Sequence, residues 1–211
     1  MFSTRTSALI LIVVATAATR LLPHLPNMTP LTALALFGGA CFANRRLAFA
    51  MPLAALVLSD LALAATDSWQ SMVVDAHVEV QYLAFALVVL LGFALRQRRT
   101  ASGIAGFTLA GSTLFFVVSN FGVWALGSMY PKTGEGLIAC YVAAIPFFRN
   151  ALVGDIVYAA LLFGGLKLLE TRFDALREPA TAGRRRLPAV RPARCARRSA
   201  GGRAANAGTS C

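Results

Sequence analysis

The sequence predicts an all-α, polytopic membrane protein, and its composition and the grouping of its apolar residues carry this prediction. Hydrophobic residues make up 57% of the 211 residues and charged residues only 14%, and the mean hydropathy is +0.66. The apolar residues gather in long runs with few charges, which is the pattern of segments that lie in a bilayer. A soluble domain of this length does not need so much apolar sequence.

Six apolar runs are candidate transmembrane helices, because a helix needs about 20 residues to cross the hydrocarbon core. They lie at about Thr6–Leu22, Pro30–Ala43, Leu47–Ala65, Val78–Leu95, Gly103–Leu126 and Asn150–Leu169. The second run is short for a crossing. A further apolar piece of about a dozen residues, Gly136–Phe148, suits a short interfacial helix before the last span.

We therefore expect a six-helix transmembrane domain over residues 1–170 and a basic cytoplasmic tail over residues 171–211. Between Pro179 and Cys211 there are eight arginines and no acidic residue, so this stretch supplies +8 of the net charge of +11. It is rich in Ala, Gly and Pro and has little to bury, which predicts disorder. Its charge suits anionic lipid rather than a nucleic-acid partner.

The loop charges predict the orientation. Arg45 and Arg46 lie between the second and third spans, and Arg96, Arg98 and Arg99 lie between the fourth and fifth. The positive-inside rule then places both termini in the cytoplasm. The opposite loops contain "PHLPNMTP", "ATDSWQSMVVDAHVEVQY" and "GSMYPKTGEGL", so the unusual polar chemistry faces outward.

Three ionisable residues within or near the spans need partners. Asp60 and Asp155 lie inside predicted spans, and Arg20 lies near the outer end of the first span. An ionised carboxylate at mid-bilayer costs about 3 kcal/mol, so such a group faces a polar cavity or a partner. Each acid could instead be neutral and hydrogen-bonded to a neighbouring helix. Arg20 could pair with an acid, bind an anionic group, or extend to the headgroups.

The segment "PNMTP" has a local structural reading. Asn27 and Thr29 can cap the following helix, and Pro30 suits its first turn. Backbone interrupted by proline is tolerated at membrane depth only where it lines a cavity or is covered by protein. Capping beside an outer pocket is therefore one interpretation, and capping alone is the other.

Small residues recur at helical spacing in the first two runs. Ala15 and Thr19 form such a pair in the first run, and Ala35 and Gly39 form one in the second. In a membrane bundle such pairs serve internal packing or dock a partner protein.

Metal and cofactor chemistry have little support in the sequence. His24 and the pair His77–Glu79 do not form a recognisable ligand set, and the four cysteines have no C-x-x-C spacing. There is no Walker lysine motif, no Gly-rich nucleotide fingerprint and no G-x-S-x-G motif. We expect no metal, no cofactor and no means of using ATP within this chain.

Two stretches carry a family resemblance: "RLLPHLPNMTPLTALALFGGACF" and "SNFGVWALGSMYPKTGEGLIACYVAAIPFFRNALVGDIVY". They resemble an uncharacterised bacterial family of six-span transport proteins, which is itself similar to the S (substrate-binding) components of energy-coupling factor transporters. The resemblance implies a ligand pocket near the outer surface, and a transmembrane coupling subunit with two ATPases as partners. The residues that it makes pocket candidates are Asn27, Thr29, Asn120, Trp124, Tyr130, Lys132, Asn150 and Asp155.

The function expected from these features is binding and uptake of a small, vitamin-like micronutrient, without catalysis by this chain. Trp124 and Tyr130 could stack on an aromatic ring, while Arg20, Lys132 and Arg149 could receive an anionic group. Two alternatives stay open. One is a self-contained permease or accessory membrane protein, and the other is an intramembrane enzyme in which Asp60 and Asp155 share a cavity.

Overall fold

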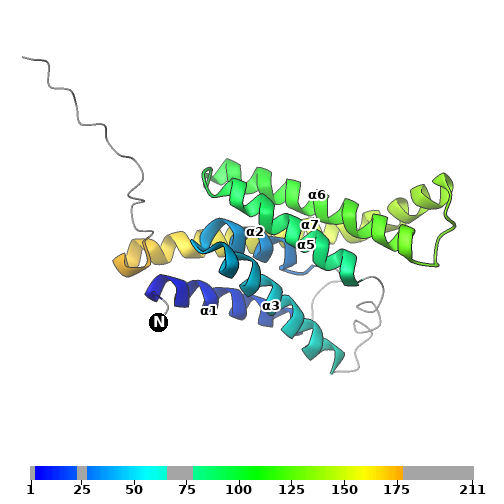
Figure 1. Cartoon of the computed structure of the whole chain (residues 1–211). Helices are drawn as coiled ribbons and strands as arrows, with labels where there is room; N and C mark the ends of the chain where they lie inside the picture. The colour runs from blue at the N-terminus through cyan, green and yellow to red at the C-terminus, as the bar shows by residue number, and fades with distance from the viewer. Residues whose placement is uncertain (1–2, 23–27, 66–77, 178–211) are drawn as a thin grey trace, which may run out of the picture. The chain divides into compact units, whose positions relative to one another are not determined.

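The computed structural model describes residues 3–22, 28–65 and 78–177, and every regular element in these ranges is helical. The predicted all-α class is thereby confirmed (Figure 1). The elements are α1 (Thr4–Ala18), η1 (Thr19–Leu21), α2 (Leu31–Cys41), α3 (Arg45–Ala64), α5 (Val78–Leu95), α6 (Ala101–Leu126), α7 (Gly134–Arg172) and η2 (Asp174–Leu176). They belong to one compact unit that ends at Arg177. Residues 171–177 of the predicted tail are part of this unit, and residues 178–211 lie outside the described residues.

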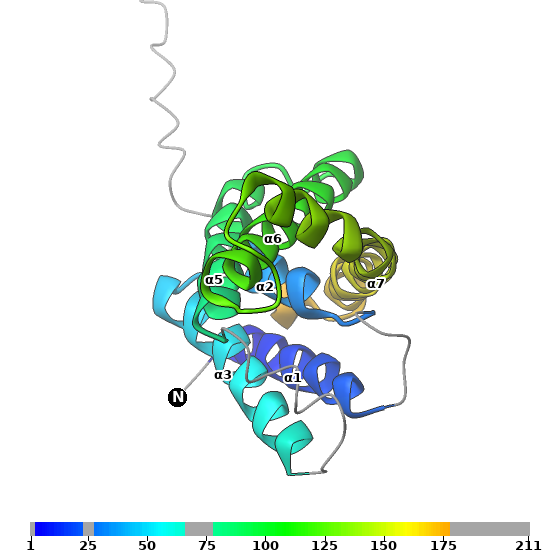
Figure 2. The same cartoon turned by 90° about the vertical axis from the view of Figure 1, so that its right-hand side faces the viewer.

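Helix α2 is the centre of this unit. All eleven of its residues are buried, and it contacts α1, α3, α5, α6 and α7, which surround it in Figure 2. Eleven residues rise about 16 Å, which is roughly half of the hydrocarbon thickness of a bilayer. Because α2 is apolar on all sides, it behaves as a core helix rather than as an amphipathic one.

Close contact of backbones holds α2 against its neighbours. A side chain at Gly39 would place its Cβ atom 2.2 Å from the carbonyl oxygen of Val89 and 2.8 Å from the Cα atom of Gly92 in α5. On the other side, a Cβ atom at Gly38 would lie 2.3 Å from the ring of Pro52 in α3. The small residues of the second run therefore serve internal packing, one of the two roles predicted for them.

Four described helices are long and apolar enough to cross a membrane: α1 continued by η1, α3, α6 and α7. These helices make the chain a membrane protein by length and composition. Helices α2 and α5 are shorter apolar helices, so the six-span count stays a prediction.

The predicted interfacial helix and the predicted last span are joined in the structure. Helix α7 continues through Pro146 and Arg149 without interruption for 39 residues. That length is about 58 Å, well beyond the roughly 30 Å of the hydrocarbon core. A polar residue such as Arg149 is exposed on this helix, so it does not need to mark a break between two segments.

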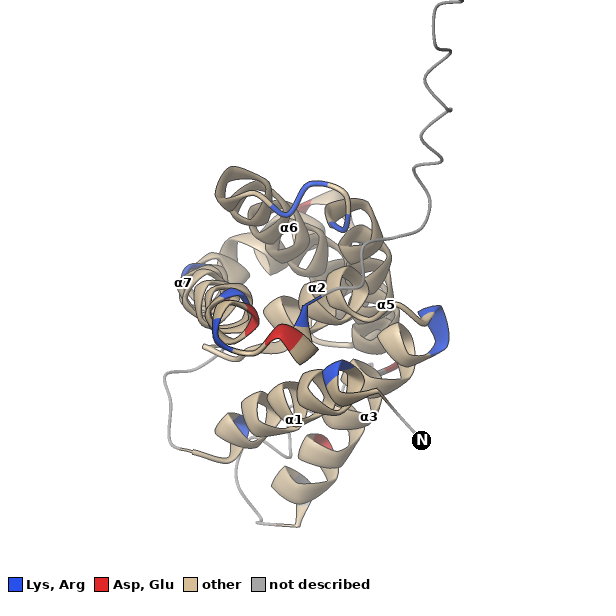
Figure 3. Ribbon diagram, turned by 90° about the vertical axis from the view of Figure 1, so that its left-hand side faces the viewer, with Lys and Arg blue, Asp and Glu red and all other residues tan. Residues whose placement is uncertain are grey.

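Successive helices run in opposite directions, so the loops that connect them lie at two opposite ends of the unit. At one end, α1, α3 and α6 begin and α2, α5 and α7 end; we call this the basic end, because Lys and Arg residues gather there (Figure 3). Arg5 joins the two termini of the unit at this end. Its Nη1 atom lies 3.0 Å from a carboxylate oxygen of Glu170 and donates a 2.8 Å hydrogen bond to the carbonyl oxygen of Leu176.

Replacing Gly39 by alanine tests the packing of α2. The added methyl group would collide with the backbone of α5, so we expect Gly39→Ala to lower the free energy of unfolding by about 1–3 kcal/mol. Thermal unfolding in detergent measures this change. Gly164→Ala on α7 is the matched control, because a Cβ atom there meets nothing within 4 Å; equal losses in the two variants would contradict the packing argument.

Candidate functional site

A buried ion pair connects α1, α3 and α5 in the half of the unit away from the basic end. The Nη1 atom of Arg20, in η1, lies 2.7 Å from Oδ1 of Asp60 in α3, and the side chains are only 7% and 8% exposed. Arg20 also donates to the hydroxyl oxygen of Ser59. Tyr82 of α5 donates a 3.1 Å hydrogen bond to the second carboxylate oxygen of Asp60.

The Arg20–Asp60 contact is one of charge rather than of aligned hydrogen bonds. Within the described residues, Oδ1 of Asp60 has no hydrogen bond of good geometry despite the short distance, and the buried Nε atom of Arg20 has no hydrogen-bond partner. The sequence left three roles open for Arg20, and the structure selects pairing with an acid. The Nε–H donor of the guanidinium is thus unsatisfied at a buried position.

Asp155 has a different environment at the beginning of α2. Its side chain is 2% exposed; Oδ1 accepts a 3.3 Å hydrogen bond from the backbone N–H of Ala33, and Oδ2 lies 2.7 Å from the hydroxyl oxygen of Ser112 in α6. The hydroxyl group and the backbone N–H of Thr32 also interact with this carboxylate. Asp155 therefore caps α2 from α7 and places a negative group at the positive end of the helix dipole.

This arrangement corrects the expected cap of α2. The N-cap residue is Pro30, which has no side chain to accept a hydrogen bond, and Thr29 precedes it. Asn27 lies outside the described residues. The acceptor comes instead from a residue 122 positions away in the sequence. We therefore assign Asp155 an anchoring role, and its predicted ligand contact stays a prediction.

Two of the other predicted pocket residues, Trp124 and Lys132, lie in the turn between α6 and α7, away from Asp155. Trp124 donates a 3.0 Å hydrogen bond from Nε1 to the carbonyl oxygen of Pro131, and the Lys132 ammonium contacts the carbonyl oxygens of Trp124 and Gly127. These hydrogen bonds join the turn between α6 and α7 to the end of α6. From Ser112 to Trp124 there are twelve residues of α6, which correspond to about 18 Å.

Among the remaining described candidates, Tyr130 lies in this turn and the others lie outside it. Asn120 donates a 2.8 Å hydrogen bond from Nδ2 to the carbonyl oxygen of Phe116 in its own helix. Tyr130 is half-buried in the turn, Asn150 is half-buried on α7, and Thr29 is half-buried before α2. The structure thus distributes the seven described candidates over α6, the α6–α7 turn, α7 and the segment before α2, and Asn27 lies outside the described residues.

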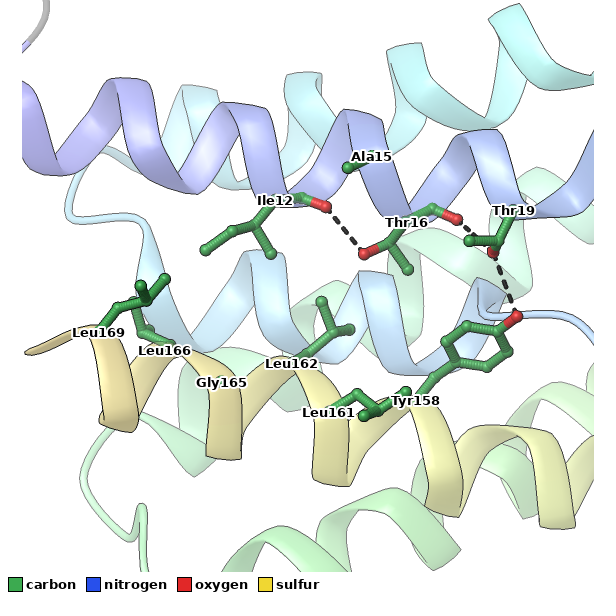
Figure 4. Close-up of a pocket in the computed structure, with 10 residues that line it drawn as sticks. All are labelled: Ile12, Ala15, Thr16, Thr19, Tyr158, Leu161, Leu162, Gly165, Leu166 and Leu169. Carbon is green, nitrogen blue, oxygen red and sulfur yellow. Dashed lines mark hydrogen bonds between the residues drawn. The ribbon is translucent and has the colours of Figure 1, made fainter.

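A groove between α1 and α7 is the hollow that the sequence analysis did not predict (Figure 4). Its volume is about 310 Å³. The residues that line it are Ile12, Ala15, Thr16, Thr19, Tyr158, Leu161, Leu162, Gly165, Leu166 and Leu169. The one sequence signal for it was the small pair Ala15–Thr19; the glycine on the facing helix was not recognised.

The described residues do not bring Asp60 and Asp155 into one acid–base pair. Asp60 interacts with Arg20 and Tyr82, whereas Asp155 interacts with Thr32, Ala33 and Ser112, so no described partner is shared. The described residues also contain no group of three or more His, Cys, Asp or Glu side chains placed to hold a metal ion. His24 and His77 lie outside those residues.

Replacing Asp155 tests its anchoring role. Asp155→Ala would leave buried N–H groups of α2 and the hydroxyl of Ser112 without this acceptor, so we expect the free energy of unfolding to fall by about 2 kcal/mol or more. Asp155→Asn keeps one acceptor oxygen and should lose less. Asn120→Ala is the comparison, with an expected change of about 0.5 kcal/mol; equal thermal unfolding of Asp155→Ala and Asn120→Ala would refute the anchoring role.

Comparison with known proteins supplies a family and no further relatives. No curated protein and no solved structure matches the chain. Residues 1–180 match DUF6580, which is described as a family of unknown function. Since the match covers most of the chain, the protein belongs to the DUF6580 family.

Proposed function

We propose that this protein is an integral membrane component that binds a small, vitamin-like micronutrient near the outer face of the bacterial inner membrane for uptake. The observation that carries the proposal is the buried Arg20–Asp60 pair. Ionisable residues are expensive inside a membrane, and where they are kept they usually mark a substrate or ion pathway. The pair lies in the half of the unit away from the basic end, which the positive-inside rule assigns to the outer side.

The chemistry of the pair indicates the kind of ligand. A buried ion pair gives little net stability, because the desolvation of both charges offsets their attraction. Arg20 retains an unpartnered Nε donor beside Ser59 and Asp60. A carboxylate or a carbonyl group of a ligand could accept that hydrogen bond while the guanidinium keeps its contact with Asp60. We therefore favour a micronutrient with an anionic or strongly accepting group.

Energy for uptake would come from other subunits. The 211 residues contain no nucleotide-binding motif, so the proposal includes a transmembrane coupling subunit and ATPases, as in the S components that the sequence resembles. A self-contained permease or accessory protein is the alternative. An intramembrane enzyme is the less favoured reading, because its two acids have separate sets of partners.

Mass spectrometry of the purified protein tests the proposal. We expect one defined small molecule to co-purify with the wild type in mild detergent. The double variant Arg20→Met/Asp60→Leu removes both charges without leaving one unpaired, so it should still fold. We expect it to retain about tenfold less of the compound, which corresponds to the loss of roughly one charge-assisted hydrogen bond.

The Arg5–Glu170 ion pair is the matched control. Arg5→Met/Glu170→Leu removes a pair at the basic end, and this variant should retain the compound. If the Arg20/Asp60 variant keeps as much compound as the wild type while remaining folded, the site is wrong. If the wild type carries no compound and binds nothing from a micronutrient panel, the proposed function is wrong.

A further inference from the structure

The α1–α7 groove exists because two positions that face it have almost no side chain. Ala15 contributes a methyl group, and a Cβ atom at Gly165 would meet nothing within 4 Å. Larger side chains at either position would fill the space. Leu161, which is 64% exposed, also lines the groove, so the groove is open at its side.

The groove is polar at one end and apolar along the rest of its length. Thr19 and Tyr158 lie where α1 ends, on the side away from the basic end, whereas Ile12 and Leu169 lie toward the basic end (Figure 4). Thr16 lies in the apolar part of the groove, but its hydroxyl hydrogen is used within α1, in a 2.8 Å hydrogen bond to the carbonyl oxygen of Ile12.

The hydroxyl groups at the polar end form an ordered chain. Thr19 donates a 2.6 Å hydrogen bond from Oγ1 to the carbonyl oxygen of Thr16, and its only hydroxyl hydrogen is thereby used. The 3.1 Å contact between Thr19 Oγ1 and Tyr158 Oη must therefore have Tyr158 as the donor. Because the hydroxyl hydrogen of Tyr158 is used in this bond, the phenol oxygen can only accept a hydrogen bond from a molecule in the groove.

We propose that the groove binds the hydrocarbon chain of an amphiphile whose head carries an O–H or N–H donor for Tyr158. Helices α1 and α7 are both candidate spans, so a hollow between them meets hydrocarbon. The polar end lies where α1 ends, and a molecule in the leaflet away from the basic end would place its head there and its chain along Leu162 and Leu166. This site is independent of the ligand proposed for Arg20.

A photo-crosslinking experiment tests the proposal with two matched probes. The full chain is reconstituted in phosphatidylcholine vesicles, whose headgroups carry no O–H or N–H donor. A long-chain alcohol with a diazirine in its chain is compared with its methyl ether, and the labelled peptides are mapped by mass spectrometry. We expect saturable labelling of groove residues, about threefold to tenfold greater for the alcohol than for the ether.

Three variants separate the groove from the rest of the lipid-facing surface. Gly165→Leu fills the groove and should abolish the saturable labelling, whereas Gly164→Leu, at an exposed position with the same open space, should leave it unchanged. Tyr158→Phe should make the alcohol and the ether equal. Non-saturable labelling, which is ordinary contact with surrounding lipid, or equal labelling of the two glycine variants would overturn the site. Equal labelling of the wild type by both probes would overturn the role of Tyr158.

Discussion

The burial of α2 is the constraint on which the rest of the structure depends. A helix end exposes backbone N–H or C=O groups that have no partner within the helix, and neither protein interior nor lipid supplies water to satisfy them. Asp155 accepts at the beginning of α2, while Arg96 donates to the carbonyl oxygens of Gly39 and Phe42 at its end. An acid at the positive end of the dipole and a base at the negative end allow a short helix to lie wholly inside the unit.

The central position of α2 also determines where α1 and α7 can meet. Both pack on α2, and they are joined to one another by a polar contact near each end of α1: Arg5 with Glu170, and Thr19 with Tyr158. Between these contacts the small residues leave the groove open. The groove therefore forms because α2 separates α1 from α7, while the polar contacts near the two ends of α1 join these two helices.

Composition and apolar runs predicted the class and most helix positions; the fourth run, Val78–Leu95, has the same limits as α5. Long-range polar partners were not predictable in this way. Asp155 and Ala33 are 122 residues apart, and nothing local in either segment connects them. The apolar runs Gly136–Phe148 and Asn150–Leu169 do not predict the continuity of α7, because the polar residues Arg149 and Asn150 interrupt the apolar sequence without interrupting the helix.

The two buried acids, Asp60 and Asp155, differ in how much of their presence the stability of the fold explains. Asp155 satisfies a helix end that has no other described acceptor from a side chain, so stability alone explains its presence. Among the described residues, the Arg20–Asp60 pair satisfies no helix end, and replacing a buried ion pair by apolar side chains of similar size is often neutral for stability. We propose that this charge pair is kept for a ligand that binds beside Arg20.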